Sequence, residues 1–246
     1  MNADDFGRTR GINAGVLEAH LAGIVTSATA MVLEPAAEEG ISEAIRRAPG
    51  LALGLHFAVT GGGFPASDAS LVPTLLVADR FARSPETLPR EIPADEIRQE
   101  LGAQILLFER LAGRPPTHLD SHHHSALHPS IQPVFAEVAR KRGLPVRASS
   151  VPARAALRAA GARTPDHFLD GFYGEGATAE NLRATLRRLD EGTSELMCHP
   201  GHADDELLAG STYARERERE LALLCDPEIP LLLALEKVER VDFRDL

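Results

Sequence analysis

Short apolar runs alternate with longer amphipathic segments along the chain. The short runs are rich in β-branched and apolar side chains, which is typical of buried strands. In the longer segments, apolar side chains recur every three or four positions, which is the spacing of an α-helix. In the first half, this pattern predicts strands at Val25–Leu33, Leu51–Phe57 and Thr117–His122, and helices at Asn13–Gly23, Pro35–Ala48, Ala94–Ala112 and Pro129–Arg142.

The second half continues in the same way. It predicts strands at Val146–Ala148, Glu195–Cys198 and Val238–Phe243, and helices at Ala153–Ala160, Thr178–Asp190, Tyr213–Leu224 and from Asp226 to Leu235. Two stretches lack a clear period. Residues 58–92 are rich in glycine and proline, and a loop of that length is typically a lid or a binding loop. Thr164–Gly176 is either a substrate-facing loop or a strand followed by a turn.

Strands that alternate with helices form βαβ units, and these units build a largely parallel sheet. For 246 residues, the favoured fold is therefore α/β, a (β/α) barrel, and a doubly wound open sheet is the alternative. No internal repeat and no shift in composition marks a domain boundary. We expect one domain across residues 1–246.

Composition narrows the range of partners. The formal net charge of −10 argues against nucleic acid and anionic membranes. Hydrophobic residues make up 43% of the chain, which is enough for a sizeable core. Cys198 and Cys225 are interpreted as free thiols of a reducing compartment. No apolar run reaches the roughly 18–20 residues of a membrane span, and the polar, acidic start is unlike a signal peptide. These features predict a cytoplasmic protein.

The stretch Thr117–Pro129 reads THLDSHHHSALHP and holds five of the ten histidines. In a strand, side chains alternate between two faces. His118, Asp120 and His122 would then share one face, and His124 would join them if the strand continued. Imidazole and carboxylate groups are the ligands that zinc, manganese and similar ions take. This stretch therefore predicts a metal site.

Other polar side chains fall where predicted strands end. Asp4 and Asp5 precede Phe6-Gly7, His56 ends an apolar run, and His199 follows the strand at 195–198. The first strand is short, since only three residues precede the acid pair. In a barrel, the carboxyl ends of the strands meet on one face, where active sites are built. The convergence of these residues predicts a functional site there.

Several longer motifs resemble one family, the YdjC-like carbohydrate deacetylases, which include chitooligosaccharide deacetylases. The motifs are NADDFG at 2–7, GIVTSATAMV at 23–32, LGLHF at 53–57, PTHLDSHHH at 116–124, MCHPGH at 197–202 and STYAREREREL at 211–221. The resemblance covers nearly the full chain. One departure is that the family pattern often has a further histidine where this chain has Ala126, whereas His128 appears here instead.

The resemblance implies a distorted (β/α) barrel related to the polysaccharide deacetylases. It implies one divalent ion, Mg²⁺ or Zn²⁺, bound by Asp5, His56 and His122. It also implies Asp4 as the catalytic base and His199 as the general acid, kept protonated by nearby carboxylates. The expected reaction is hydrolysis of an N-acetyl group on an amino sugar or short oligosaccharide, with release of acetate. A homodimer is a further expectation from the family.

Three more residues are expected to assist. We expect Asp120 and His124 to orient His122 or to contact substrate, and Tyr173 to contact substrate from the 164–176 loop. Aromatic residues are only 4% of the chain and tryptophan is absent, which favours a short sugar.

Two alternative functions remain open. A metal-dependent phosphoesterase would use Arg8 or Arg10 to hold phosphate. A non-catalytic sugar-binding relative would lack the base or the acid.

Overall fold

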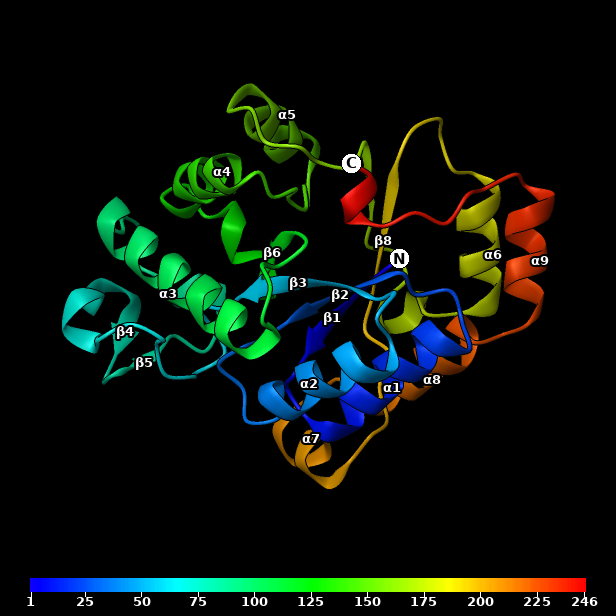
Figure 1. The fold of residues 1–246 in the computed structure, drawn as a ribbon, viewed down its shortest axis with the longest axis horizontal. Coiled ribbons are helices and arrows are strands. Elements are labelled where there is room, and N and C mark those ends of the chain that lie inside the picture. Colours follow the sequence, from blue (N-terminus) through cyan, green and yellow to red (C-terminus); the bar gives the residue numbers. More distant parts are fainter.

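Six parallel strands form the centre of the protein in the order β6-β3-β2-β1-β8-β7. A computed structural model describes residues 1–246 (Figure 1). The sheet curls into a half-barrel, which confirms the expected fold class. The strands are β1 Asn2–Phe6, β2 Ser27–Ala30, β3 Ala52–Phe57, β6 Leu119–Ser121, β7 His167–Leu169 and β8 Ser194–Cys198.

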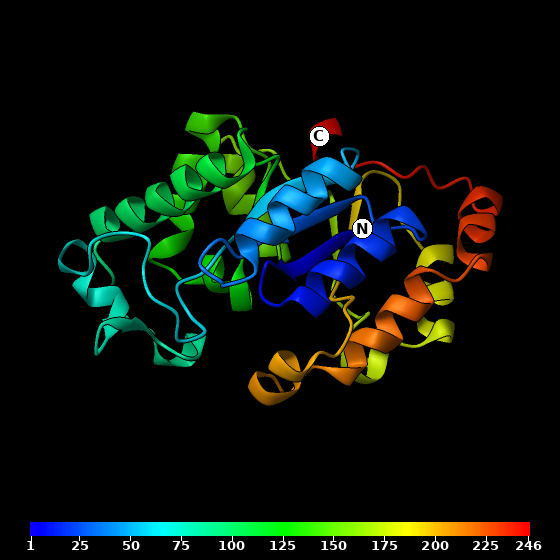
Figure 2. The same ribbon diagram turned by 60° about the horizontal axis from the view of Figure 1, so that its bottom comes forward.

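Helices surround the outside of this sheet (Figures 1 and 2). Neighbouring helices pack in the pairs α1 with α8, α2 with α3, α3 with α4, α4 with α5, and α6 with α9. They are α1 Arg10–Leu21, α2 Ala37–Arg47, α3 Ala94–Ala112, α4 Ile131–Arg142, α5 Val151–Ala159, α6 Ala179–Arg187, α7 Asp205–Gly210, α8 Arg215–Leu224 and α9 Glu228–Leu235.

Helix α3 has the bounds that the sequence predicts. Ile97, Leu101, Ile105 and Phe108 recur at helical spacing, and all four are fully buried against the core. Each such burial contributes roughly 1.5–3 kcal/mol. The helix ends at Gly113, whose φ of 65° lies in the left-handed region that glycine adopts without strain.

Strands β1 and β3 are buried along their whole length. Helices cover the outer face of the sheet, and the inner face encloses the interior of the half-barrel (Figure 2). A strand buried on both faces reads as an apolar run in the sequence, as β3 does. Polar residues are therefore unexpected on β1. Each of them needs either a buried polar partner or a functional role.

Some predicted strands are shorter or absent. The prediction of a strand at Val238–Phe243 is wrong, because this tail forms no ladder and ends in a 3₁₀ turn at Phe243–Asp245. The Phe243 ring instead stacks on His118, with ring centroids 3.8 Å apart. The segment Val146–Ala148 forms only an isolated bridge, between Val146 and Leu119. Strand β2 is limited to Ser27–Ala30 within the predicted Val25–Leu33.

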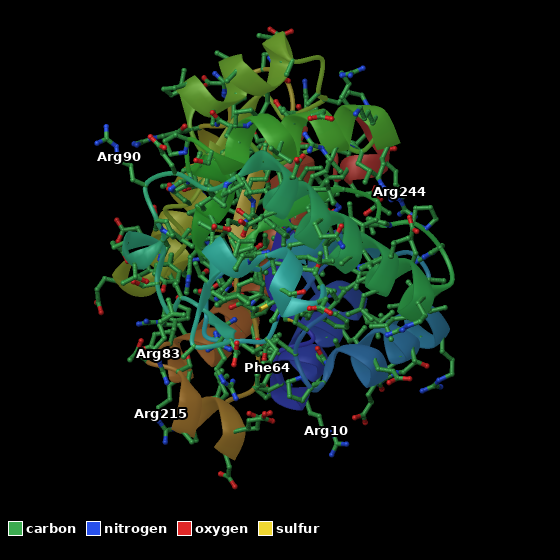
Figure 3. All side chains as sticks on the ribbon, turned by 90° about the vertical axis from the view of Figure 1, so that its left-hand side faces the viewer. Arg10, Phe64, Arg83, Arg90, Arg215 and Arg244 are labelled. Carbon is green, nitrogen blue, oxygen red and sulfur yellow. The ribbon has the colours of Figure 1, made fainter.

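The long segment 58–92 is anchored to α3. Buried Glu100 accepts hydrogen bonds from the backbone nitrogens of Ala66 and Ser67, and buried Gln104 bonds both backbone groups of Ala58. The segment also contains a small hairpin, β4 Leu76–Val77 and β5 Arg80–Phe81. Figure 3 shows its outer face, with Phe64 at the surface. These bonds fix the segment to α3.

No helix is both long and apolar enough to cross a bilayer.

We predict that Glu100→Ala loosens the segment 58–92. The change leaves two backbone donors without their acceptor, which costs about 1–3 kcal/mol. Limited proteolysis should then cut within residues 60–70 faster than in the unchanged protein. Gln99→Ala, at an exposed position on the same helix, is the control. Equal cleavage rates in the two variants would contradict the anchoring role.

Candidate active site

A cavity of about 540 Å³ opens where the carboxyl ends of the strands meet. Such a volume is in the range of small-molecule sites. The predicted convergence is observed, because the lining includes all five residues expected to act as base, acid or metal ligands: Asp4, Asp5, His56, His122 and His199. His124 and Tyr173 also line it, whereas Asp120 lies beneath them and is fully buried.

The backbone at Asp5 explains how two adjacent carboxylates reach one cavity. Asp5 has a φ of 65°, in the left-handed region, and the pairing of β1 with β2 shifts register between Ala3 and Phe6. Aspartate tolerates this conformation better than most residues. The irregularity cancels the strict alternation of the strand, so both acids point inward. Strain of this kind tends to be found at functional sites.

The histidine stretch also changes conformation. Strand β6 ends at Ser121, and His122–Leu127 is a 3₁₀ segment in which His123 and His124 both have φ near 50°. His124 therefore does not continue the strand, and it does not orient His122. Its Nδ1 lies 3.2 Å from the Ser149 hydroxyl, and its ring stands edge-on to Phe168.

Asp5, His56 and His122 form a compact donor group. Asp5 Oδ1 lies 3.1 Å from His122 Nδ1 and 3.5 Å from His56 Nε2. The other carboxylate oxygen of Asp5, Oδ2, accepts a hydrogen bond from the buried guanidinium of Arg217. One carboxylate oxygen therefore remains directed at two imidazoles. The group has the chemistry of a divalent metal site, since its three donor atoms lie within 4.8 Å of one another.

Asp120 orients His56 rather than His122, which corrects the expectation from sequence. His56 Nδ1 donates to Asp120 Oδ1 at 2.6 Å, and Thr29 donates to the other oxygen of Asp120 at 2.9 Å. A carboxylate on one ring nitrogen leaves the other nitrogen available as a ligand. Burial opposes a charge on the ring, but Asp120, Asp5 and Asp4 outweigh it and raise the pKa of His56 to about 10. Metal binding would therefore release a proton.

A second group, Asp4 with His56 and Asp120, has similar spacing, but its two carboxylates are already paired with the cation of Arg147. The buried guanidinium of Arg147 donates to both oxygens of Asp4 at 2.6 Å. Its Nε donates to Glu195 at 2.7 Å, and Nη1 lies 3.1 Å from Asp120. Burial tends to raise the pKa of Asp4, but Arg147 outweighs it and holds that pKa below its usual range. Asp4 is thus an ionised carboxylate paired with the guanidinium of Arg147.

His199 follows β8 and lies near Asp4. Its Nε2 is 3.9 Å from Asp4 Oδ2, whereas its buried Nδ1 has no partner. Burial lowers the pKa of His199 to about 4, despite the pull of Asp4. The expectation that nearby carboxylates keep this ring protonated is therefore wrong for this arrangement, because burial dominates.

His118 is a structural residue on the same face as Asp120. It is fully buried on the floor of the half-barrel, where its Nε2 lies 3.0 Å from Asn2 Oδ1. Burial lowers its pKa to about 3, so the ring is neutral. Gly54 allows this packing, since a Cβ there would lie 2.6 Å from the imidazole.

Sequence reasoning missed several residues that shape this site. Arg147 belongs to no recognised motif, and the only signal is a charged residue in the middle of the predicted strand Val146–Ala148. Arg217 and Glu220 lie within the motif at 211–221, but the local pattern gives them no role. Their buried positions on a highly charged helix depend on tertiary packing, which the local pattern does not reveal.

The fold and this site define an α/β half-barrel protein with a candidate metal centre. Residues 1–234 match the family described as YdjC-like protein, and the chain belongs to that family, which confirms the resemblance. A carbohydrate deacetylase of Geobacillus stearothermophilus is 40% identical over 247 residues, covering 100% of this chain and 96% of the relative. A chitooligosaccharide deacetylase of Serratia marcescens is 38% identical over 253 residues, covering 100% and 98%.

Solved structures give the same fold. A protein of Enterococcus faecalis, described as a candidate cellobiose-phosphate cleavage protein, has a TM-score of 0.93 at 32% identity, covering 99% of this chain and 96% of that one. A family 4 carbohydrate esterase of Streptomyces lividans has a TM-score of 0.52 at 14% identity, covering 96% and 86%. The second likeness concerns the fold alone.

We predict that Arg147→Met strongly destabilises the protein. The substitution leaves Asp4 and Glu195 buried without their cation, which typically costs about 3–5 kcal/mol. Urea unfolding at pH 7 measures the loss. Arg142→Met is the control, because Arg142 pairs with Glu109 in a partly exposed position and should cost less than about 1 kcal/mol. A similar loss in both variants would contradict the assigned role of Arg147.

Glu195 predicts a pH dependence. Burial raises its pKa to about 7 despite Arg147, whereas an unfolded glutamate titrates near ~4.3. Between those values the folded state holds the extra proton, so this residue makes stability fall as pH rises, by up to about 1.4 kcal/mol per pH unit. Glutamine keeps the acceptor for Arg147 and does not titrate. Relative to the unchanged protein, Glu195→Gln should therefore gain stability from pH 5 to 7 and then level off.

Urea unfolding at pH 5, 6, 7 and 8 tests this. Glu191→Gln, at an exposed position, is the control. A difference that does not vary with pH for Glu195→Gln would refute the raised pKa.

Proposed function

We propose that this protein is a metal-dependent carbohydrate deacetylase, formed by residues 1–246 as one domain. The observation that carries the proposal is the division of the acid pair. Asp4 is neutralised by Arg147, while Asp5 faces His56 and His122. An ionised base beside a separate metal-binding group is what hydrolysis of an unreactive amide requires. The names of the relatives support the same activity.

The donor set fits one divalent ion held by Asp5, His56 and His122, with either Mg²⁺ or Zn²⁺ as the candidate. When bound, such an ion polarises a carbonyl group and lowers the pKa of a bound water. A mixed carboxylate and imidazole set favours a borderline ion such as Zn²⁺, whereas Mg²⁺ prefers oxygen ligands and retains several waters.

The protein's own groups would handle the protons. Asp4 remains ionised at neutral pH, because Arg147 holds its pKa low, and it would accept a proton from the attacking water. Asp4 Oδ2 lies 3.9 Å from His199 Nε2, which is beyond direct hydrogen-bond distance, so this proton would pass to the neutral imidazole through one bridging water. His199 would then donate it to the departing amine. This order removes the need for His199 to be protonated in the resting protein.

We assign substrate contact to Tyr173 and His124. Tyr173 is 47% exposed and lines the cavity, so its ring is available to stack on a sugar. His124 lines the cavity from the 3₁₀ segment after β6, and its Nδ1 is hydrogen-bonded to the Ser149 hydroxyl. A cavity of about 540 Å³ favours a short acetylated sugar over a long polymer.

A metal-dependent phosphoesterase is the second candidate. The description of the Enterococcus faecalis protein mentions a phosphorylated sugar. Arg8 lines the same cavity, and its guanidinium lies 3.9 Å from Asp5. A non-catalytic sugar-binding protein is the third, and it differs by the absence of turnover. A cytoplasmic location and a homodimer stay predictions.

We predict that the purified protein holds about one divalent ion per chain and releases acetate from di-N-acetylchitobiose. A chelator should abolish the release, and re-addition of the native ion should restore it. Asp4→Asn should lower kcat by roughly 10²–10⁴-fold, as expected for loss of a general base, while the bound ion is retained. Asp95→Asn, at a side chain that is 97% exposed, is the matched control.

Each result separates the candidates. Phosphate release in place of acetate would favour the phosphoesterase. An unaffected kcat in Asp4→Asn would remove Asp4 from the catalytic base role.

A further inference from the structure

The tract 211–221 places three polar side chains on one face of α8. Tyr213, Arg217 and Glu220 are separated by four and three positions, so they line up along the helix and the turn before it. Arg217 and Glu220 are 2% and 0% exposed, whereas Glu218 lies on the exposed side. Arg217 donates a hydrogen bond to Asp5, which is one of the proposed metal ligands. The proposed function does not explain Glu220.

Both oxygens of buried Glu220 accept hydrogen bonds. Oε1 accepts from the Tyr213 hydroxyl, and Oε2 accepts from the backbone nitrogen of His199 at 2.5 Å. Burying a carboxylate is costly unless its lone pairs are satisfied. Here one bond connects α8 to the loop after β8, which carries His199, and the other connects it to the turn before the helix.

The Tyr213 bond extends this connection to the wall of the cavity. The Tyr213 hydroxyl accepts a hydrogen bond from the backbone nitrogen of Gly174 at 2.9 Å. Its ring stacks on Tyr173, with centroids 4.3 Å apart and planes 15° apart. Both rings meet His199 edge-on, at 5.2 Å for Tyr173 and 5.9 Å for Tyr213. Glu220 therefore holds the backbone of His199 and, through Tyr213, the rings that flank its imidazole.

This packing matters because the His199 ring lacks a partner of its own at Nδ1, which is buried. Its orientation depends on its backbone and on the two tyrosine rings. We propose that Glu220 is a positioning residue that sets the orientation of the His199 imidazole. This inference rests on the proposed function, in which His199 donates the proton to the leaving amine.

A double-mutant cycle tests the proposal. Glutamine at 220 has only one acceptor oxygen for two donors, so one of the two bonds must be lost. Glu220→Gln should lower kcat for acetate release from di-N-acetylchitobiose by about 10–100-fold, with KM changed less than about threefold. In the His199→Ala background the same change should lower kcat less than about threefold, because the residue through which it acts is gone.

Glu218→Gln, on the exposed side of α8, is the matched control and should leave kcat unchanged in both backgrounds. Tyr213→Phe is the second variant, and it removes only the hydroxyl. It should show the same pattern with a smaller loss. Metal content and thermal unfolding, measured for every variant, establish that each one is folded and loaded.

Equal losses from Glu220→Gln with and without His199 would overturn the proposal, since purely structural damage multiplies with the loss of His199. Independent effects of Tyr213→Phe in the two backgrounds would overturn it as well. Failure of the proposed function is a different result, because the unchanged protein would then release no acetate in the same assay.

Discussion

The buried guanidinium of Arg147 is the interaction on which the site depends. It contacts Asp4 on β1, Asp120 on β6 and Glu195 on β8, and all four side chains lie inside the half-barrel. Three carboxylates this close together would repel one another without a cation between them. The segment that carries Arg147 forms only one β-bridge, with Leu119. Charge pairing thus connects β6 with β1 and β8, which share no ladder with it.

A second arginine completes the arrangement. Adjacent acids on β1 each receive their own guanidinium, Asp4 from Arg147 and Asp5 from Arg217. The pairings differ in their consequences. Asp4 has both oxygens occupied and stays ionised, whereas Asp5 keeps one oxygen directed at His56 and His122. Two neighbouring residues of the same type therefore acquire the separate roles that we propose for them.

Local patterns predicted the elements that depend on local physics. The helix at Ala94–Ala112 has apolar residues at helical spacing and a terminal glycine, and its predicted bounds match the structure. Polar residues at strand ends were correctly expected to converge, because parallel strands in a curled sheet bring their carboxyl ends together. The alternation of strands and helices predicted a largely parallel sheet, but it left both a curled barrel and a doubly wound open sheet possible.

Features set by tertiary contacts could not be predicted in this way. The residues 238–243 alternate like a strand, but they join no ladder of the sheet, and Phe243 packs on His118 instead. The partner of Asp120 depends on which histidine faces it across the sheet, and β3 places His56 beside it. Arg147 and Glu220 are charged, and only the fold shows that they are buried.

The central claim is that the ion binds between Asp5, His56 and His122 and not in the adjacent group of Asp4 and Asp120. Anomalous X-ray diffraction from crystals soaked with Zn²⁺ measures this directly. We expect one strong peak among the first three residues, with Asp4 still bound to Arg147. A peak between Asp4 and Asp120, or displacement of Arg147 by the ion, would contradict the claim.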